Sequence, residues 1–130
     1  VVGTHVLIDL FDTGRRWASR SAEGLSAAAA SGPLVINDMV FAELSVGFEE
    51  CAACEAFLAQ LEIGLLPTPK AALFLAGQAH RAYRRRGGER SNVLPDFFIG
   101  AHAVYAGLPL ITRDPRRFIL SFPALQIIAP

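Results

Sequence analysis

Apolar and polar positions alternate along this chain in blocks that predict short buried strands separated by helices. A buried strand of a parallel sheet is apolar on both faces, because helices cover the sheet on either side. Four short runs of this kind stand near turn-forming glycine or proline residues: 34–36, 64–66, 108–111 and 125–128. Val1 and Val2 indicate the end of a further strand that opens the chain.

Between these runs, apolar residues recur at the three- and four-residue spacing of helices that bury one face. The predicted helices cover residues 15–31, 38–48, 51–61, 70–86 and 95–106. A shorter apolar helical turn follows the opening strand. Asn37 is placed to cap the helix after the strand 34–36. Pro95 suits the first turn of its helix, and Gly107 ends that helix.

The alternation of strands with helices predicts parallel strands joined by right-handed crossovers. We therefore expect an α/β fold, a three-layer α/β/α sandwich with a central parallel sheet. The apolar share of 52% and the mean hydropathy of +0.37 fit a sheet covered on both faces. At 130 residues the chain is large enough for one core, so residues 1–130 are expected to form a single domain.

Composition and charge narrow the function classes. No apolar run is long enough to cross a bilayer and no secretory pattern opens the chain, so we expect a cytoplasmic protein with no membrane partner. Lys+Arg and Asp+Glu balance at 12 each, so no overall field favours nucleic acid. Basic residues nevertheless gather in residues 81–90 and 112–117, and such local patches can contact phosphates.

The two cysteines, Cys51 and Cys54, form a C-x-x-C pair within a predicted helix. No second Cys/His pair stands at zinc-ligand spacing, so the pair does not indicate a zinc site. Neighbouring glutamates disfavour the thiolate form. We expect two ordinary reduced thiols.

Two acids are expected at one rim of the sheet. Asp96 lies in the first turn of the helix that begins near Pro95, and Asp114 follows the strand 108–111. One helix–strand unit thus carries both, and open α/β sheets bind ligands at the carboxyl ends of their strands. Glu43 joins them in this interpretation, because the strand 34–36 leads directly into its helix.

Glu43 also lies within the apolar stripe of its helix, formed by Val40, Leu44 and Gly47. A carboxylate on that side is costly unless a partner neutralises it. Asp38 lies on another side of the helix, where it favours the helix dipole. Three converging carboxylates suggest an Mg²⁺ or Mn²⁺ site. The alternative from spacing alone is that the acids serve as caps and in ion pairs to Arg113 or Arg116.

Several blocks of the sequence resemble the PIN-domain proteins of the VapC-like toxin family, and the resemblance runs nearly end to end. The blocks are GTHVLID (3–9), INDMVFAEL (36–44), RRRGG (84–88), PDFFIGAHA (95–103), LPLITRD (108–114) and FPALQIIAP (122–130). PDFFIGAHA followed by TRD at this distance is a specific signal, whereas RRRGG alone is weak. The resemblance implies a metal-dependent endoribonuclease, the toxin of a type II toxin–antitoxin pair.

The resemblance maps the family's acidic, metal-binding site onto Glu43, Asp96 and Asp114. Thr112 matches a residue that accompanies the last acid, in a supporting role as a hydrogen-bond donor. The implied cofactor is Mg²⁺ or Mn²⁺, which would orient a water for in-line attack on an RNA phosphodiester. Implied partners are a VapB-like antitoxin, the RNA substrate and a second copy of the chain as a homodimer.

The opening block departs from the family. Members have an aspartate at the end of the first strand as a central metal ligand, and here that position holds Gly3. Thr4 and Asp9 match supporting family positions, and His5 is a conceivable substitute ligand. The vacated position predicts weakened metal binding, and cleavage that is lost or reduced by orders of magnitude. This glycine fits an engineered or spontaneous inactivating change as well as natural degeneration.

Basic residues near these acids are candidates for contacting RNA phosphates. Arg113 and Arg116 flank Asp114 most closely, together with Arg117. Arg86 ends a run of three arginines, 84–86, which either steers RNA toward the acids, contacts an acidic antitoxin segment or is simply solvated.

Three other functions are alternatives to the nuclease. A non-catalytic PIN-fold module that captures an antitoxin or RNA is the main alternative. A phosphoacceptor receiver domain needs a lysine late in the chain, and Lys70, the only lysine, is on the wrong element. A nucleotide-binding fold is disfavoured, because no glycine-rich loop follows the first strand. His102 lies away from Asp96 around its helix and is expected to be a packed, hydrogen-bonded residue.

Overall fold

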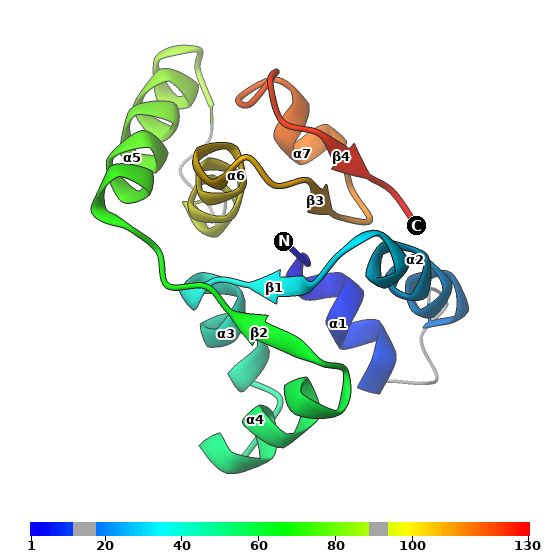
Figure 1. Ribbon diagram of the computed structural model, residues 1–130. Coiled ribbons are helices and arrows are strands. Elements are labelled where there is room, and N and C mark those ends of the chain that lie inside the picture. The colour runs from blue at the N-terminus through cyan, green and yellow to red at the C-terminus, as the bar shows by residue number, and fades with distance from the viewer. Residues whose placement is uncertain (12–17, 89–93) are drawn as a thin grey trace.

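The computed structural model of the chain describes residues 1–11, 18–88 and 94–130. Helices and strands alternate there as the sequence pattern predicts (Figure 1). In chain order they are α1 (Thr4–Phe11), α2 (Ala18–Ser31), β1 (Leu34–Ile36), α3 (Asp38–Ser45), α4 (Cys51–Gln60), β2 (Ile63–Leu65), α5 (Lys70–Arg85), α6 (Leu94–Ala106), β3 (Leu110–Ile111), α7 (Arg116–Ile119) and β4 (Ile127–Ile128). The predicted helix 15–31 is described from Ala18 onward, and its first three positions lie outside the described residues.

The opening residues join two pairs of strands into one layer. β1 pairs with β2 and β3 pairs with β4, both in parallel. Val2 forms a parallel bridge to Ile111 of β3, and its N–H donates to the carbonyl of Val35 in β1 over 2.8 Å. The strand layer therefore runs β2, β1, residues 1–3, β3, β4. The predicted parallel sheet is confirmed, with a very short central segment.

Helices cover both sides of this layer, which confirms the predicted sandwich. In Figure 1, α1, α3 and α4 lie on one side of β1 and β2, and α5 and α6 lie on the other. α6 packs against α5, α3 and α7, and α1 packs against α2 and α3. The core between the layers contains fully buried side chains from strands and helices alike, including Val2, Leu7, Ile36, Leu44 and Leu110. No helix in the described ranges has the length and apolar character needed to cross a bilayer.

The small residues of α6 allow close packing, as its composition predicts. Six of its residues are buried, among them Gly100. An added Cβ at Gly100 would stand 2.5 Å from the ring of Phe122, which lies just beyond α7. α7 can therefore approach α6 only because this position lacks a side chain, and α7 carries part of the site described below.

Several predicted boundaries were wrong. α3 ends at Ser45, because the next residues form tighter turns in which the N–H of Gly47 bonds to Leu44 over 3.1 Å. Gly47 is exposed as a result and is not part of the buried stripe that holds Val40 and Leu44. The strands are shorter or shifted, with β2 beginning at Ile63 and β4 at Ile127. α7 was not predicted, because one helical turn is too short for a periodic pattern.

Candidate functional site

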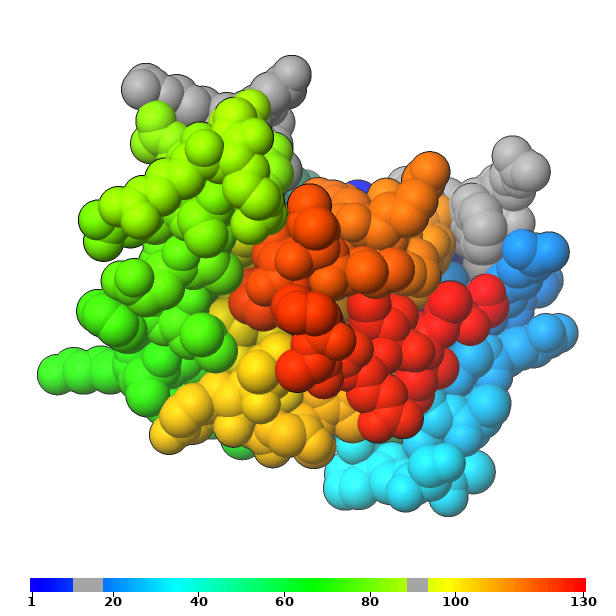
Figure 2. Space-filling model, turned by 90° about the horizontal axis from the view of Figure 1, so that it is seen from above, coloured from blue at the N-terminus to red at the C-terminus, as the bar shows by residue number. Residues whose placement is uncertain are grey.

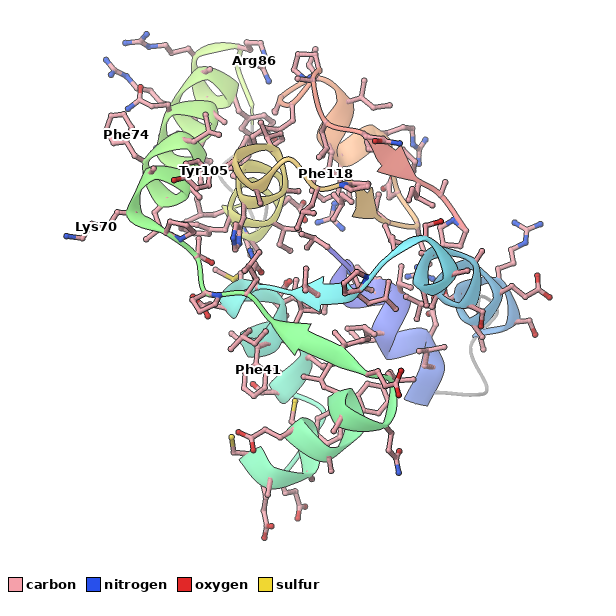
Figure 3. The ribbon with its side chains drawn as sticks, in the orientation of Figure 1. Phe41, Lys70, Phe74, Arg86, Tyr105 and Phe118 are labelled. Atoms are coloured by element: carbon pink, nitrogen blue, oxygen red, sulfur yellow. The ribbon has the colours of Figure 1, made fainter. Side chains whose placement is uncertain are left out.

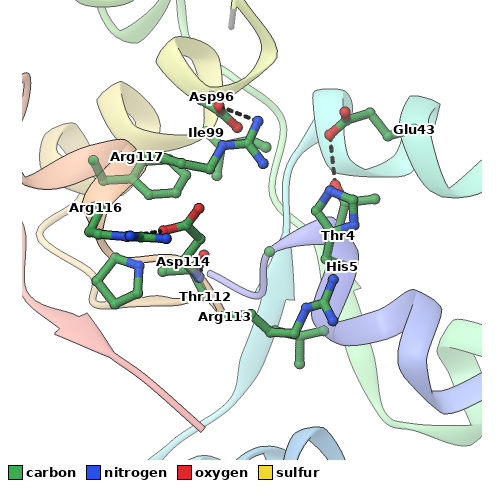
Figure 4. A pocket seen from close by; sticks show the side chains of 14 residues that line it. Thr4, His5, Glu43, Asp96, Ile99, Thr112, Arg113, Asp114, Arg116 and Arg117 are labelled. Atoms are coloured by element: carbon green, nitrogen blue, oxygen red, sulfur yellow. Dashed lines mark hydrogen bonds and ion pairs between the residues drawn. The ribbon is translucent and has the colours of Figure 1, made fainter. Parts of the chain in front are cut away.

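A pocket of about 500 Å³ opens at the rim of the sheet, between the start of α1, α3, α6 and the segment that follows β3 (Figure 4). The three acids expected from the sequence, Glu43, Asp96 and Asp114, all line this pocket. Its other lining residues are Gly3, Thr4, His5, Val6, Ile99, Thr112, Arg113, Pro115, Arg116, Arg117 and Phe118. Elements far apart in the sequence thus place three carboxylates around one cavity.

Glu43 reaches the pocket from α3. The side chain of Asn37 accepts a hydrogen bond from the N–H of Val40 over 3.0 Å, which caps α3 as predicted and fixes its direction after β1. Glu43 is half-buried, and its Oε1 accepts a hydrogen bond of 2.7 Å from the hydroxyl of Thr4. Thr4, at the start of α1, therefore orients this carboxylate.

Asp96 reaches the pocket from the first turn of α6, and its side chain is only 13% exposed. Burial raises the pKa of its carboxyl, and the nearby charges of Glu43 and Asp114 raise it further. Arg117 opposes this shift, because its Nη2 stands 2.6 Å from Oδ2 of Asp96. The net pKa remains raised. The carboxyl of Asp96 thus lies close enough to both other acids to be affected by their charges.

Asp114 lies in the loop between β3 and α7, with its side chain 41% exposed. Its Oδ1 is 3.3 Å from Nε of Arg116. Its backbone N–H donates to Oγ1 of Thr112 over 3.2 Å, so the buried threonine shapes the loop that presents the acid. Thr112 was expected to support the acid as a donor, and in the structure its hydroxyl oxygen accepts this bond.

Residues 3–9, the opening block, bring few possible metal ligands to the pocket. Gly3 lines the pocket, and a Cβ at this position would lie 3.0 Å from the carbonyl oxygen of Ile111. His5 also lines the pocket and is exposed.

Asp9 does not line the pocket. Its fully buried carboxylate accepts a hydrogen bond of 2.6 Å from the hydroxyl of Ser21 and stands 3.5 Å from Nη1 of Arg113. The geometry assigns Asp9 to holding Arg113 at the pocket.

The candidate phosphate-binding arginines divide into two groups. Arg113 and Arg116 line the pocket. Arg86 does not; it follows the end of α5 and donates to the hydroxyl of Ser121 over 3.3 Å. The pairing of Arg117 with Asp96 was missed by sequence reasoning. The only signal was its proximity to Asp114 in the sequence, since the short helix that presents it has no recognisable pattern.

The pocket suits a hard divalent cation by donor type. Its carboxylates, together with the hydroxyls of Thr4 and Thr112, are oxygen ligands of the kind that Mg²⁺ and Mn²⁺ prefer. They are not arranged as a preformed site: across the described ranges, no three Asp, Glu, His or Cys side chains stand close enough to hold an ion. Asp96 and Asp114 are instead paired with arginines.

Neither cysteine offers competing chemistry. A hydrogen bond from the Cys51 thiol to Glu55, and the charge of Glu55, raise the pKa of Cys51. Burial is the main cause of the raised pKa of Cys54. Both thiols are free, as the spacing of the chain predicts.

Comparisons with known proteins bear on this site and fold. A model of the PIN domain matches residues 1–120. No curated protein matches the sequence.

Several solved structures have the same fold. VapBC2 of Rickettsia felis, bound to promoter DNA, superposes with a TM-score of 0.75 at 17% identity, covering 98% of this chain and 96% of that one. VapBC-1 of nontypeable Haemophilus influenzae gives 0.72 at 18% identity, with 98% and 95% covered. FitAcB of Neisseria gonorrhoeae gives 0.66 at 20% identity, with 99% and 96% covered. At these identities the likeness establishes the fold.

Proposed function

Because this chain belongs to the PIN-domain family, we propose that it is the toxin of a toxin–antitoxin pair and a metal-dependent endoribonuclease. The observation that carries the proposal is the convergence of Glu43, Asp96 and Asp114 on one pocket from three separate elements. A pocket with three carboxylates and adjacent arginines matches the needs of phosphodiester hydrolysis, in which charge is handled at both the attacking water and the phosphate.

Each side chain has a role in this proposal. Glu43, Asp96 and Asp114 hold Mg²⁺ or Mn²⁺, which when bound lowers the pKa of a water and offsets phosphate charge. Thr4 keeps the carboxylate of Glu43 in one orientation, and Thr112 holds the backbone of the Asp114 loop. Arg113 and Arg116 bind phosphate at the pocket, because guanidinium groups match phosphate oxygens in geometry and charge. Asp9 positions Arg113.

Gly3 weakens this machinery. The position lines the pocket and offers no carboxylate where the family has an aspartate, so one strong ligand for the ion is missing. We infer that the chain as it stands binds the ion weakly and cleaves RNA slowly or not at all. The fold does not depend on that ligand, since removing one acid from an acidic cluster relieves repulsion.

The partners follow from the same premise. An antitoxin protein is proposed because a solved structure with the same fold, from Klebsiella pneumoniae, is a toxin–antitoxin complex. RNA is the proposed substrate, and the cytoplasm is the proposed location. A homodimer is included because large apolar side chains remain on the surface. Phe74 of α5 is 70% exposed and points away from the molecule (Figure 3). Leu120, after α7, is 72% exposed.

The alternative function is a PIN-fold binding module without catalysis. It is favoured by two observations in the same pocket: Gly3 offers no ligand, and arginines already engage Asp96 and Asp114. Such a module would bind an antitoxin or RNA and leave RNA intact. Full antitoxin affinity together with absent nuclease activity would select it.

RNA cleavage in Mg²⁺ or Mn²⁺ tests the proposal, with Gly3→Asp compared to the unchanged chain. We expect Gly3→Asp to cleave at least about a hundredfold faster, which corresponds to roughly 3 kcal/mol of transition-state stabilisation. Adding Asp114→Asn to Gly3→Asp should abolish the gain. Gly3→Ala is the matched control, because it brings the same Cβ to 3.0 Å from Ile111 without a carboxylate.

The outcomes separate the candidate functions. If no form cleaves any RNA tested, the binding module is the better account of the chain. If the unchanged chain already cleaves well, the ligand assigned to position 3 is not needed, and that part of the proposal is wrong.

A further inference from the structure

Arginines stand beside the carboxylates of the pocket. Three carboxylates, those of Glu43, Asp96 and Asp114, line it together with three guanidinium groups. Of these arginines, Arg113 is paired with Asp9 outside the pocket, whereas Arg116 and Arg117 are paired with Asp114 and Asp96. A divalent cation that enters the pocket must therefore compete with arginines for the oxygens of Asp96 and Asp114.

The arginine pairs are not equivalent. Arg117 Nη2 lies 2.6 Å from Oδ2 of Asp96, with the two side chains 37% and 13% exposed (Figure 4). Arg116 Nε lies 3.3 Å from Oδ1 of Asp114, with side chains 91% and 41% exposed. Water screens the second pair much more than the first, so the second pair is easily opened.

Asp96 also needs its partner more than Asp114 does. Its side chain is more buried than that of Asp114, and an unpaired carboxylate in such a place is unfavourable. Arg117 supplies the compensating charge from α7, which is packed on the same helix that carries Asp96. The guanidinium thus stands where a cation bound to Oδ2 of Asp96 would stand.

We propose that Arg117 competes with the divalent cation for Asp96 and so sets how much Mg²⁺ or Mn²⁺ the chain needs to load its site. The proposal rests on the proposed function for the identity of the ion. A cation and a guanidinium on the same carboxylate carry like charges that repel each other. Because Arg117 already contacts Oδ2 of Asp96, it weakens binding of the ion at that oxygen. Full binding of the ion to Asp96 is therefore expected to move Arg117 away from Oδ2, and its partly exposed side chain at the pocket has room to do so.

Binding of Mn²⁺ to the whole chain tests this, measured by the electron paramagnetic resonance signal of the free ion. The variant is Arg117→Gln, which removes the charge while keeping a polar side chain. Arg116→Gln is the matched control, since it removes the same charge from the other arginine–aspartate pair of the pocket. We expect Arg117→Gln to tighten Mn²⁺ binding at least about tenfold, and Arg116→Gln to change it less than about threefold, as for screened pairs.

A third variant tests whether the tighter Mn²⁺ binding depends on Asp96. Arg117→Gln combined with Asp96→Asn should lose the tighter binding, because the oxygen for which the two cations compete is then no longer charged. Equal tightening by Arg116→Gln would overturn the proposal, since the effect would come from the general field of the pocket. Unchanged or weaker Mn²⁺ binding by Arg117→Gln would also overturn it.

A measurement without substitution guards against misfolding of the variants. Titration of the unchanged chain with Mg²⁺, followed by the side-chain Nε–Hε resonance of Arg117, should shift that resonance as the ion displaces the guanidinium. A resonance that stays fixed while Mg²⁺ binds elsewhere in the pocket would overturn the proposal.

Failure of the inference and failure of the proposed function are distinguishable. If Arg117→Gln binds Mn²⁺ more tightly but no form cleaves RNA, the proposed competition stands and the proposed nuclease function is wrong. If Gly3→Asp cleaves RNA but Arg117→Gln does not change the Mn²⁺ affinity, the proposed nuclease function stands and the proposed competition is wrong.

Discussion

At the scale of single residues, burial decides which ionisable groups respond to pH. His102 is 1% exposed on α6, and its Nδ1 lies 3.4 Å from the hydroxyl of Thr68. It is therefore the packed, hydrogen-bonded residue expected from the sequence. Burial lowers its pKa, and the charge of Asp38 opposes the shift only in part. His102 is neutral in the folded chain under conditions where an exposed imidazole is already charged.

A pH dependence of stability follows from that shift. Above the ordinary pKa of about 6.5, both the folded and the unfolded chain carry a neutral His102, and stability is unaffected. Below it, the unfolded chain takes up a proton first, so the free energy of unfolding falls until the pH reaches the lower folded pKa. Thermal unfolding between about pH 7.5 and 5 should show His102→Gln to be less sensitive to acid than the unchanged chain.

His80→Gln is the matched control for this prediction, because it removes a half-buried imidazole from α5. If His102→Gln retained the full acid sensitivity of the unchanged chain, the buried histidine would not be its source.

At the scale of elements, the site depends on how α7 seats against α6. Gly100 makes this contact possible, since an added Cβ would stand 2.5 Å from the ring of Phe122 and 3.2 Å from that of Phe118. Both aromatic side chains are almost fully buried, and Phe97 of α6 packs against Phe122 with ring centroids 6.0 Å apart. Arg117 belongs to α7, so its ion pair with Asp96 depends on this packing of α7 against α6.

Gly100→Ala should destabilise the fold by about 1–3 kcal/mol, as overpacking of a filled core does. Chemical denaturation measures the loss. Gly77→Ala is the matched control, because nothing lies within 4 Å of its added Cβ and α5 should gain about 0.5–1 kcal/mol from it. Replacing Phe122 by leucine should remove much of the Gly100→Ala penalty in a double-mutant cycle. Additive penalties would mean that the two residues do not press on each other.

At the scale of the whole molecule, acidic and basic residues are equal in number but concentrated in different parts of the chain. Residues 38–69 contain six acids and no lysine or arginine, whereas residues 70–88 contain five basic residues and no acid. α4 and the arginine-bearing end of α5 lie at opposite ends of the molecule in Figure 1. Figure 2 shows α5 beside the segment that follows β3, in agreement with the bond between Arg86 and Ser121. One end of the molecule thus favours phosphates, and the other repels them.

This asymmetry predicts where RNA binds. Affinity for single-stranded RNA, measured without divalent ions to prevent cleavage, should fall in Arg84→Gln/Arg85→Gln. Its salt dependence should weaken by about 1.4 in the slope of log K against log salt, about 0.7 for each lost phosphate contact. Glu49→Gln/Glu50→Gln is the control at the acidic end, and there affinity should stay the same. Equal effects from the two pairs, opposite in sign, would show that net charge alone governs binding.

The sequence by itself determined the order of the elements and the chemistry of the pocket. Apolar runs on both faces predicted the strands, helical spacing predicted the longer helices, and the Asn37 cap followed from its place after a strand. The acids could be found in advance because parallel strands bring their carboxyl ends to one rim. These features are local, since each depends on residues only a few positions apart.

Only the tertiary structure decided which side chains meet. It pairs Arg117 with Asp96 and Thr4 with Glu43, and it directs Asp9 away from the pocket toward Ser21. It also joins the two strand pairs through Val2. Such contacts link residues far apart in the chain, so they depend on how helices pack on the sheet. The pattern of apolar and polar residues within a few positions does not determine that packing. The proposed competition between Arg117 and a cation for Asp96 arises from the packing.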